Sequence, residues 1–289
     1  MADAALMESL IELKALIESA LLERLPSADS EPRDIHAAMH YAVMSGGKRL
    51  RPTLALAVAE LGNAGPHQVL DAACAIEFVH TASLILDDLP AMDNADFRRS
   101  QPSVHVVYGE ATAILAALAL LAEAYALTAR NAKELMSAEG VADVIETLSR
   151  TIGTAGLIRG QHVDLTSTAS EVSPEILDET YRQKAAVLFQ AAIAIPAKLI
   201  GMDEQQQAAL EVYATQIGVA FQITDDIIDG EHGTAEDAHK CTFNTILGEA
   251  GARRKASELV FNATGALQIF GDRGTQLRMI AEYVATRAQ

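Results

Sequence analysis

Two groups of three aspartates each follow an apolar stretch of this sequence. They are Asp87, Asp88 and Asp93 in the first group, and Asp225, Asp226 and Asp229 in the second. Asp225 and Asp229 are four residues apart and so lie on one face of a helix, where like charges repel. Either group alone would fit a solvated polar face about as well as a metal site. Two such groups together predict Mg²⁺, which takes one or two carboxylates and shares phosphate oxygens with a substrate.

The first group is placed by an apolar helix that precedes it. His80 lies seven residues before Asp87, which is two helical turns, so both side chains share a face and His80 could reach a substrate bound there. Pro90 is expected to end the regular helix. The geometry from Asp87 to Asp93 therefore cannot be derived from helical spacing.

Cations cluster next to these acids in a chain that is otherwise strongly acidic. Lys and Arg number 22 against 39 Asp and Glu, for a net charge of −17. The cations of interest are Lys48, Arg49 and Arg51 in the segment GGKRLRP, the pair Arg98 and Arg99, and the isolated Lys184 and Lys240. Surface ion pairs would explain any one of them, but the set predicts phosphate capture. GGKRLRP is not a P-loop, because the GxxxxGK[ST] spacing is absent.

Composition narrows the class of protein. The negative net charge disfavours nucleic acid and anionic lipid as partners. Two distant cysteines, Cys74 and Cys241, are expected to be free thiols. The N-terminal segment lacks the basic start of a signal peptide, and the uncharged run 111–122 is too short to span a bilayer. We therefore expect a soluble, cytoplasmic protein.

His36 and His40 could form a zinc pair, but no third ligand is evident.

The elements that must position these residues are helices. Alanine and leucine dominate, no alternating strand pattern stands out, and several helices are apolar all round, as in the interior of a large bundle. We expect a single all-α domain over residues 1–289, with helices near 3–25, 33–45, 51–62, 67–90, 110–130, 140–165, 173–200, 203–229 and 249–287. The two aspartate groups would face each other inside it. A diphosphate with an apolar tail is the ligand that such a site suits.

At this point the sequence resembles the trans-isoprenyl diphosphate synthases (polyprenyl synthetases) over nearly the whole chain. The segments that carry the resemblance are GGKRLRP (46–52), HTASLILDDLPAMDNADFRR (80–99), GQHVDL (160–165), Lys184, FQITDDIID (221–229) and DAHKCTFNTILG (237–248). The resemblance implies antiparallel helices around a deep central cavity. It also implies a homodimer.

The resemblance further implies the role of each site residue. The six aspartates would hold Mg²⁺ on an allylic diphosphate, with Gln222 contacting the diphosphate or a metal-bound water. Lys184, Lys240 and Arg98 would neutralise the departing diphosphate. Isopentenyl diphosphate would be bound by Lys48, Arg51, His80 and Arg99. The allylic diphosphate would ionise, the double bond of isopentenyl diphosphate would attack the cation, and a proton would be lost.

Three features depart from the family's usual pattern. Ala185 stands where threonine is common, and Ser100 stands where glycine usually follows the arginine pair. The loop from Gly230 to Lys240 is short, acidic and lacks one lysine.

Product length in this family depends on bulk just before the first aspartate group. Ala82 lies five residues before Asp87, about 7 Å along the helix, and leaves the floor open. This favours a twenty-carbon product, geranylgeranyl diphosphate, although Leu118 or Tyr125 could supply a floor. The alternatives are a fifteen-carbon farnesyl diphosphate synthase, a terpene cyclase-like enzyme or a non-catalytic partner subunit.

Overall fold

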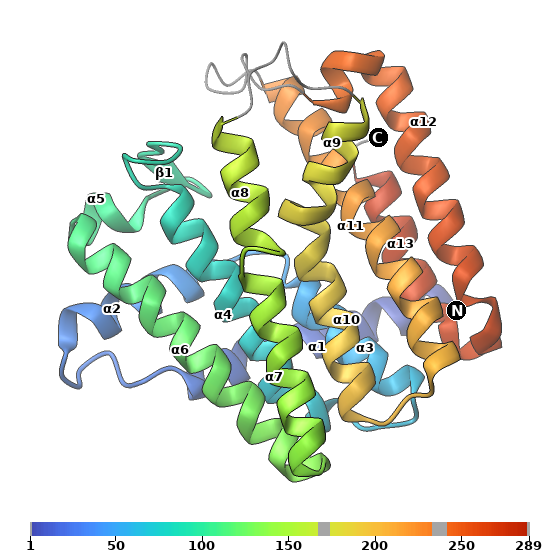
Figure 1. Ribbon diagram of the computed structural model, residues 1–289, viewed down its shortest axis with the longest axis horizontal. Coiled ribbons are helices and arrows are strands. Elements are labelled where there is room, and N and C mark those ends of the chain that lie inside the picture. The colour runs from blue at the N-terminus through green and yellow to red at the C-terminus, as the bar shows by residue number, and fades with distance from the viewer. Residues whose placement is uncertain (1, 167–173, 233–241, 288–289) are drawn as a thin grey trace. The chain divides into compact units, whose positions relative to one another are not determined.

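The computed structural model describes residues 2–166, 174–232 and 242–287. They are almost entirely helical, as expected (Figure 1). The chain forms two compact units, 1–145 and 146–289. The first unit contains α1 (Ala2–Arg24), α2 (Arg33–Met44), α3 (Leu50–Leu61), the 3₁₀ turn η1 (Pro66–Val69), α4 (Leu70–Asp87), β1 (Phe97–Arg98), β2 (Gln101–Pro102), α5 (Val104–Tyr108) and α6 (Glu110–Leu135). The helix α7 (Ala138–Ile152) crosses the boundary. The second unit contains α8 (Leu157–Thr166), α9 (Pro174–Tyr181), the π-turn η2 (Arg182–Ala186), α10 (Val187–Leu199), α11 (Glu204–His232), α12 (Phe243–Ala266), η4 (Leu267–Gly274) and α13 (Thr275–Thr286).

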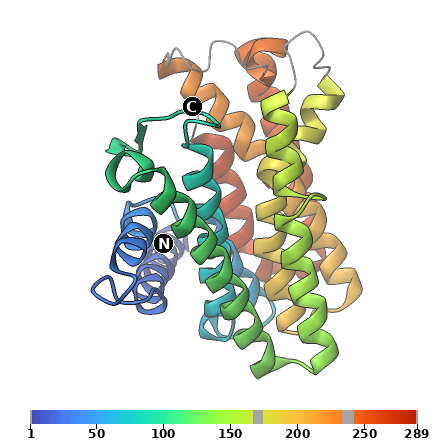
Figure 2. The same cartoon turned by 60° about the vertical axis from the view of Figure 1, so that its left-hand side comes forward.

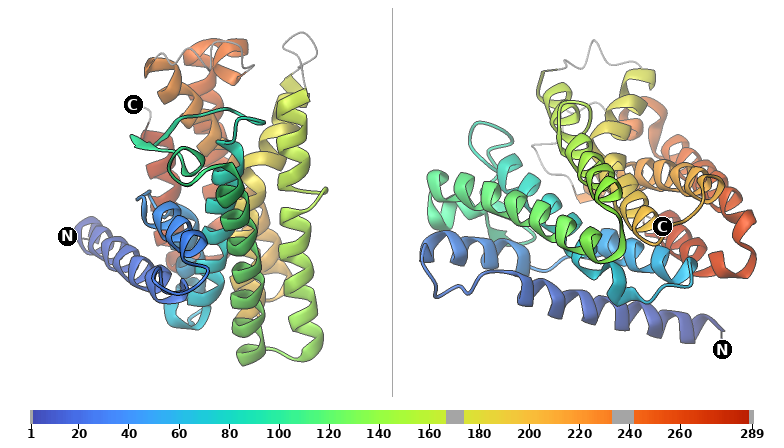
Figure 3. Two further views of the ribbon diagram at one scale, coloured as in Figure 1. Left: turned by 90° about the vertical axis from the view of Figure 1, so that its left-hand side faces the viewer. Right: turned by 60° about the horizontal axis from the view of Figure 1, so that its bottom comes forward.

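The core of the first unit is built on α4. Its side chains between Ala72 and Val79 are all buried, as a helix that is apolar nearly all round requires. The neighbouring α6 runs antiparallel beside it, and α1 packs on both α3 and α4 (Figures 2 and 3). The helix ends at Asp87, so the same packing that buries α4 places the first aspartate group.

The core of the second unit is built on the 29-residue helix α11, which packs against α10 and lies antiparallel to α12 (Figure 1). Tyr213 and Phe189 are fully buried there. At Gly218 the backbone of α11 comes so close to η2 that a Cβ atom would lie 2.4 Å from the Cα atom of Ala186. Glycine at this position therefore permits the contact.

Two long helices expected from the sequence are interrupted. The expected helix 140–165 breaks between α7 and α8, where a Cβ on Gly156 would lie 2.3 Å from the carbonyl oxygen of Thr151. The expected helix 249–287 is divided by η4, in which Gly271 has a φ of 56°. The two-residue strands β1 and β2 were also unexpected, because a pairing this short leaves no periodic pattern.

Two helical segments in the described ranges are long and apolar enough to cross a membrane by length and composition. They are Pro66–Asp87, whose most apolar stretch is 72% buried, and Glu110–Leu135, for which the figure is 39%. The uncharged run 111–122 is thus part of a longer helix. The core helix of a water-soluble protein meets the same criteria, and the burial of α4 fits that case.

Candidate active site

The first aspartate group lies where α4 ends and the chain turns back. The backbone N–H of Asp93 donates to the carbonyl oxygen of Asp87 at 2.9 Å, and the N–H of Ala95 donates to that of Asp88 at 3.1 Å. These bonds return the loop to the end of the helix, a relation that spacing alone could not give. The side chains of Asp87 and Asp93 are both partly exposed. They therefore remain accessible to a bound cation.

Asp88 is held differently from its neighbour. It is only 3% exposed, and Nε of Arg98 donates to its two carboxylate oxygens at 3.0 and 3.3 Å. Nη2 of Arg98 donates to the same carboxylate. Burial lowers the pKa of Arg98, but the hydrogen bond to Asp88 and the nearby acidic charges outweigh it, so the net shift is upward. The arginine is thus firmly charged and tied to Asp88.

The hairpin of β1 and β2 delivers Arg99 to the GGKRLRP segment. Arg99 and Ser100 form its turn with φ angles of 52° and 64°, as in the two-residue turns that match strand twist. Nη1 of Arg99 donates to the carbonyl oxygen of Gly46. A Cβ on Gly47 would lie 2.8 Å from the same Nη1 atom, so the second glycine makes room for the arginine.

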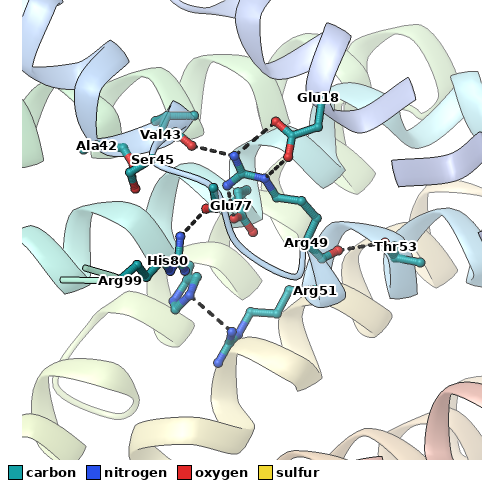
Figure 4. A network of polar contacts seen from close by, with 11 residues as sticks. Glu18, Ala42, Val43, Ser45, Arg49, Arg51, Thr53, Glu77, His80 and Arg99 are labelled. Carbon is teal, nitrogen blue, oxygen red and sulfur yellow. Dashed lines mark hydrogen bonds and ion pairs between the residues drawn. The ribbon is translucent and has the colours of Figure 1, made fainter. Parts of the chain in front are cut away.

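The Arg49 side chain lies in the core, with its guanidinium between Glu18 and Glu77 (Figure 4). Its guanidinium donates to Glu18 at 2.8 Å, to Glu77 at 2.7 Å and to the carbonyl oxygen of Val43 at 2.6 Å. The side chains of Arg49 and Glu77 are 1% and 3% exposed. Arg49 thereby fixes the loop that carries the exposed Lys48. Sequence reasoning missed Glu77, although a lone glutamate in an apolar helix was a signal for a buried ion pair.

Lys48, Arg51, His80 and Arg99 make up a cationic region of the first unit. Besides the contact of Arg99 with Gly46, it contains a contact between Arg51 and His80. Nη1 of Arg51 lies 3.4 Å from Nε2 of His80 (Figure 4). Burial and the charges of Arg51 and Arg99 hold the pKa of His80 well below 6.5, so its imidazole is neutral at neutral pH. Burial also lowers the pKa of Arg51 to about 10, partly offset by Glu77, which leaves it charged. A phosphate bound here would meet the guanidinium donors of Arg51, held in place beside the neutral imidazole of His80.

In the second aspartate group, Asp225 is paired with a residue distant in sequence. Nη2 of Arg287 donates to its Oδ1, and the guanidinium lies 3.8 Å from the centroid of the Phe221 ring. The Arg287 side chain is 3% exposed, whereas that of Asp225 is 33% exposed. The carboxylate thus keeps an open side.

Asp226 is held from two directions. Gln222, one turn earlier on α11, donates to its Oδ1 at 2.9 Å, and the hydroxyl of Tyr181 donates to its Oδ2. The Tyr181 ring packs edge-on against Phe243, with centroids 5.4 Å apart. Burial first, and then Asp226, raises the pKa of Tyr181, so the phenol remains a donor. Sequence reasoning missed Tyr181, and no local pattern points to it.

Lys184 lies in the π-turn η2, where its Nζ donates to Asp164 at 2.5 Å. A Cβ on Gly160 would lie 2.6 Å from the backbone nitrogen of Lys184, so this glycine lets α8 pack on the turn. Both Gly160 and Asp164 belong to the GQHVDL segment, to which the sequence assigned no role. π-turns inside helices are frequent at functional sites. Ala185 is buried in the same turn.

The donor chemistry of the two groups fits Mg²⁺. Among the described residues, no three side chains of His, Cys, Asp or Glu gather into a metal cage. Mg²⁺ does not need one, because it keeps waters and completes its shell with substrate phosphates. Asp87, Asp93 and Asp225 are all partly exposed, which suits that mode. The side chain of Asp229 and all of Lys240 lie outside the described residues.

Two alternatives raised by the sequence can be compared with the structure. Nδ1 of His36 lies 2.9 Å from the hydroxyl of Ser30, and Nε2 of His40 lies 2.7 Å from the carbonyl oxygen of Pro26, so each ring already has a polar partner. The zinc interpretation therefore gains no support. Cys74 is a buried free thiol, as expected, and burial raises its pKa to about 12.

Comparison with known proteins finds similarity over most of the chain. Residues 32–246 match the polyprenyl synthetase family. A geranylgeranyl diphosphate synthase of Cyanophora paradoxa is 36% identical over 98% of this chain and 96% of its own length. A putative chloroplastic geranylgeranyl pyrophosphate synthase 8 of Arabidopsis thaliana is 38% identical over 89% of this chain and 75% of its own length.

The fold agrees with the sequence match. The crystal structure of an FPP/GFPP synthase from Zymomonas mobilis superposes with a TM-score of 0.89 at 34% identity, covering 99% of this chain and 100% of the other. The chain therefore belongs to the polyprenyl synthetase family, the trans-isoprenyl diphosphate synthases.

Proposed function

We propose that the protein is a Mg²⁺-dependent short-chain prenyltransferase that joins isopentenyl diphosphate to an allylic diphosphate and releases geranylgeranyl diphosphate. The observation that carries this proposal is the cationic region of the first unit. There, Arg99 bonds to the GGKRLRP segment and Arg51 lies against a neutral His80, next to carboxylates at the end of α4. A protein with a net charge of −17 has little other use for such a region.

Isopentenyl diphosphate is assigned to this cationic region. Arg51 and Arg99 supply the guanidinium donors, and the exposed Lys48 adds a point charge. His80, neutral because of its burial, contributes polar contacts without a further charge. Arg49 is excluded from direct binding because its donors are used by Glu18, Glu77 and Val43.

The allylic diphosphate is assigned to the aspartates. Asp87, Asp88 and Asp93, together with Asp225, Asp226 and Asp229, would hold Mg²⁺, with Gln222 orienting Asp226. The metal, when bound, supplies Lewis-acid stabilisation of the diphosphate leaving group. Arg98, Lys184 and Lys240 would add positive charge on the diphosphate. Arg98 and Lys184 are held by Asp88 and Asp164, so each must change partner or share its donors when substrate binds.

The product assignment is supported by the residues on α4. Ala82, the small residue five before Asp87, is fully buried, so a larger side chain at this position would take up space inside the first unit. Leu118, an alternative floor residue, is 54% exposed. The relatives named for geranylgeranyl diphosphate agree with a twenty-carbon product, whereas the Zymomonas protein is named an FPP/GFPP synthase.

The test is a product assay with purified protein, Mg²⁺, isopentenyl diphosphate and five-, ten- or fifteen-carbon primers. A twenty-carbon alcohol after dephosphorylation is expected, and Ala82→Tyr should shift it to fifteen carbons or fewer. Ser83→Phe, one turn before Asp87, provides a second barrier if Ala82→Tyr does not fold. A fifteen-carbon product from the unaltered protein would favour farnesyl diphosphate synthase. Failure to elongate any primer would favour a cyclase-like enzyme or a partner subunit.

The quaternary structure and location are also proposals. The contacting helices α5 and α6 carry five exposed apolar side chains, which suits a homodimer interface. They are Val106, Val107, Ile114, Leu115 and Leu118, which are 39% to 54% exposed. Leu115→Glu should yield monomers in light scattering.

We further propose one polyprenyl synthetase domain over residues 1–289, since the family match extends across both units. We also propose a cytoplasmic location.

A further inference from the structure

We propose that Tyr181 is a positioning residue that orients Asp226 for metal binding through its phenol hydroxyl. This inference rests on the function proposed above. The chain uses a residue 45 positions away in sequence to control one carboxylate of the second aspartate group.

The position of the hydroxyl is strongly constrained. Tyr181 ends α9 and is 7% exposed, and its ring lies edge-on to Phe243 at an interplanar angle of 83°. A buried phenol ring that packs on one aromatic neighbour has little freedom to turn away. Its single polar atom is directed at Oδ2 of Asp226.

Asp226 consequently has each oxygen engaged by a different donor. Gln222 engages Oδ1 from the same helix, at the i, i+4 spacing that lets neighbouring turns meet. Tyr181 engages Oδ2 from another element. A carboxylate can accept about four hydrogen bonds or ligands, so these two bonds do not by themselves exclude a cation. The two donors therefore fix the plane of the carboxylate without blocking it.

The same tyrosine links Asp226 to Lys184. The π-turn η2 begins directly after Tyr181 and carries Lys184 two residues further along. Gly160 and Gly218 allow close packing on this turn, with Cβ atoms that would lie 2.6 Å from the backbone of Lys184 and 2.4 Å from Ala186. The hydroxyl bond thus ties the carboxylate to the segment that holds the cation for the diphosphate.

Donors that orient metal ligands typically change metal affinity 10- to 100-fold when removed. Tyr181→Phe deletes the hydroxyl and keeps the ring on Phe243. Because several aspartates share the metal, we expect the lower end of this range, about a tenfold higher Mg²⁺ concentration at half-saturation. The KM for isopentenyl diphosphate should change less than twofold, since its proposed site lies on other elements.

The experiment measures the rise in melting temperature on titrating Mg²⁺ at a fixed concentration of inorganic pyrophosphate, alongside the Mg²⁺ dependence of elongation. Tyr213→Phe is the matched control, because it removes another buried phenol hydroxyl, which donates to the carbonyl oxygen of Leu277 at 2.7 Å. It should lower the melting temperature without moving the Mg²⁺ midpoint. A purely structural role for Tyr181 would give the same pattern, and that would overturn the proposal.

A double variant tests the route of the effect. In an Asp226→Asn background, Tyr181→Phe should move the Mg²⁺ midpoint less than twofold further, because the orienting target is gone. A full tenfold shift in that background would overturn the proposal. If the unaltered protein elongates normally and Tyr181→Phe leaves the Mg²⁺ midpoint unchanged, only this inference is refuted. An unaltered protein that neither elongates nor responds to Mg²⁺ with pyrophosphate refutes the proposed function as well.

Discussion

The two aspartate groups are stabilised in different ways in the two units. In the first unit, Asp88 is bound by Arg98, ten residues further along the chain. In the second, Asp225 and Asp226 are bound by Arg287 and Tyr181, which lie 62 and 45 positions away. The first group is therefore organised by local turns, and the second by packing between distant elements.

Charge is also distributed differently. The first unit concentrates arginines and balances them with the buried Glu77, whose partner Arg49 is almost fully buried too. The second unit pairs a buried arginine, Arg287, with a carboxylate that is one-third exposed. If Arg49 is removed, the charge of Glu77 stays buried away from water. If Arg287 is removed, the charge of Asp225 can be solvated. Substitution of the two arginines distinguishes these cases.

The largest effect is expected for Arg49→Met. It leaves Glu77 buried and without its charged partner, which typically costs about 3–5 kcal/mol in the free energy of unfolding. Urea denaturation measures this loss. Adding Glu77→Gln should restore much of it, because the uncompensated charge is removed. An Arg49→Met variant as stable as the parent protein would contradict the buried network.

Arg287→Met should cost less, about 1–2 kcal/mol, because Asp225 can be solvated after its partner is removed. The same urea titration, run beside Arg49→Met, gives the comparison. The exposed pair of Arg150 and Glu146 supplies a control, since Arg150→Ala should change stability by at most about 0.5 kcal/mol. Equal losses for Arg49→Met and Arg287→Met would remove the distinction between the two units.

The pH dependence of stability should carry a signature of His80. Its pKa is lowered in the folded chain, so below about pH 6.5 the unfolded chain binds the proton first. The free energy of unfolding should therefore fall as pH drops below that value, by up to about 1.4 kcal/mol per pH unit from this group. His80→Asn should reduce the slope relative to the parent protein. His67→Asn, at an exposed site, should not.

The smallest effect is expected at the hairpin turn. Ser100 has a φ of 64°, a left-handed conformation that disfavours a residue with a Cβ atom. Ser100→Gly removes this strain but adds freedom to the unfolded chain, so we expect a net gain of about 0.5 kcal/mol. Thermal denaturation can detect it. Ser100→Ala retains the strain and should bring no gain, so a gain there would argue against the strained turn.

Much of the fold was predictable from local pattern. The helical class and most helices follow from the spacing of apolar residues, and the cationic residues of the first unit follow from their clustering in an acidic chain. The interruptions between α7 and α8 and at η4 were not predictable, because apolar periodicity continues across the glycines that cause them. The burial of the Arg49 side chain was also not predictable, because nothing in the pattern of GGKRLRP distinguishes Arg49 from the neighbouring cations.

The sequence by itself determined which residues could do chemistry, because residue type and spacing within one helix fix which side chains share a face. Only the tertiary structure decided how they are held. Asp93 returns to Asp87 through backbone bonds in a loop that contains a proline, where helical spacing no longer applies. Tyr181 and Arg287 meet Asp226 and Asp225 through packing across many tens of residues, and no short-range pattern encodes which distant segments will pack together.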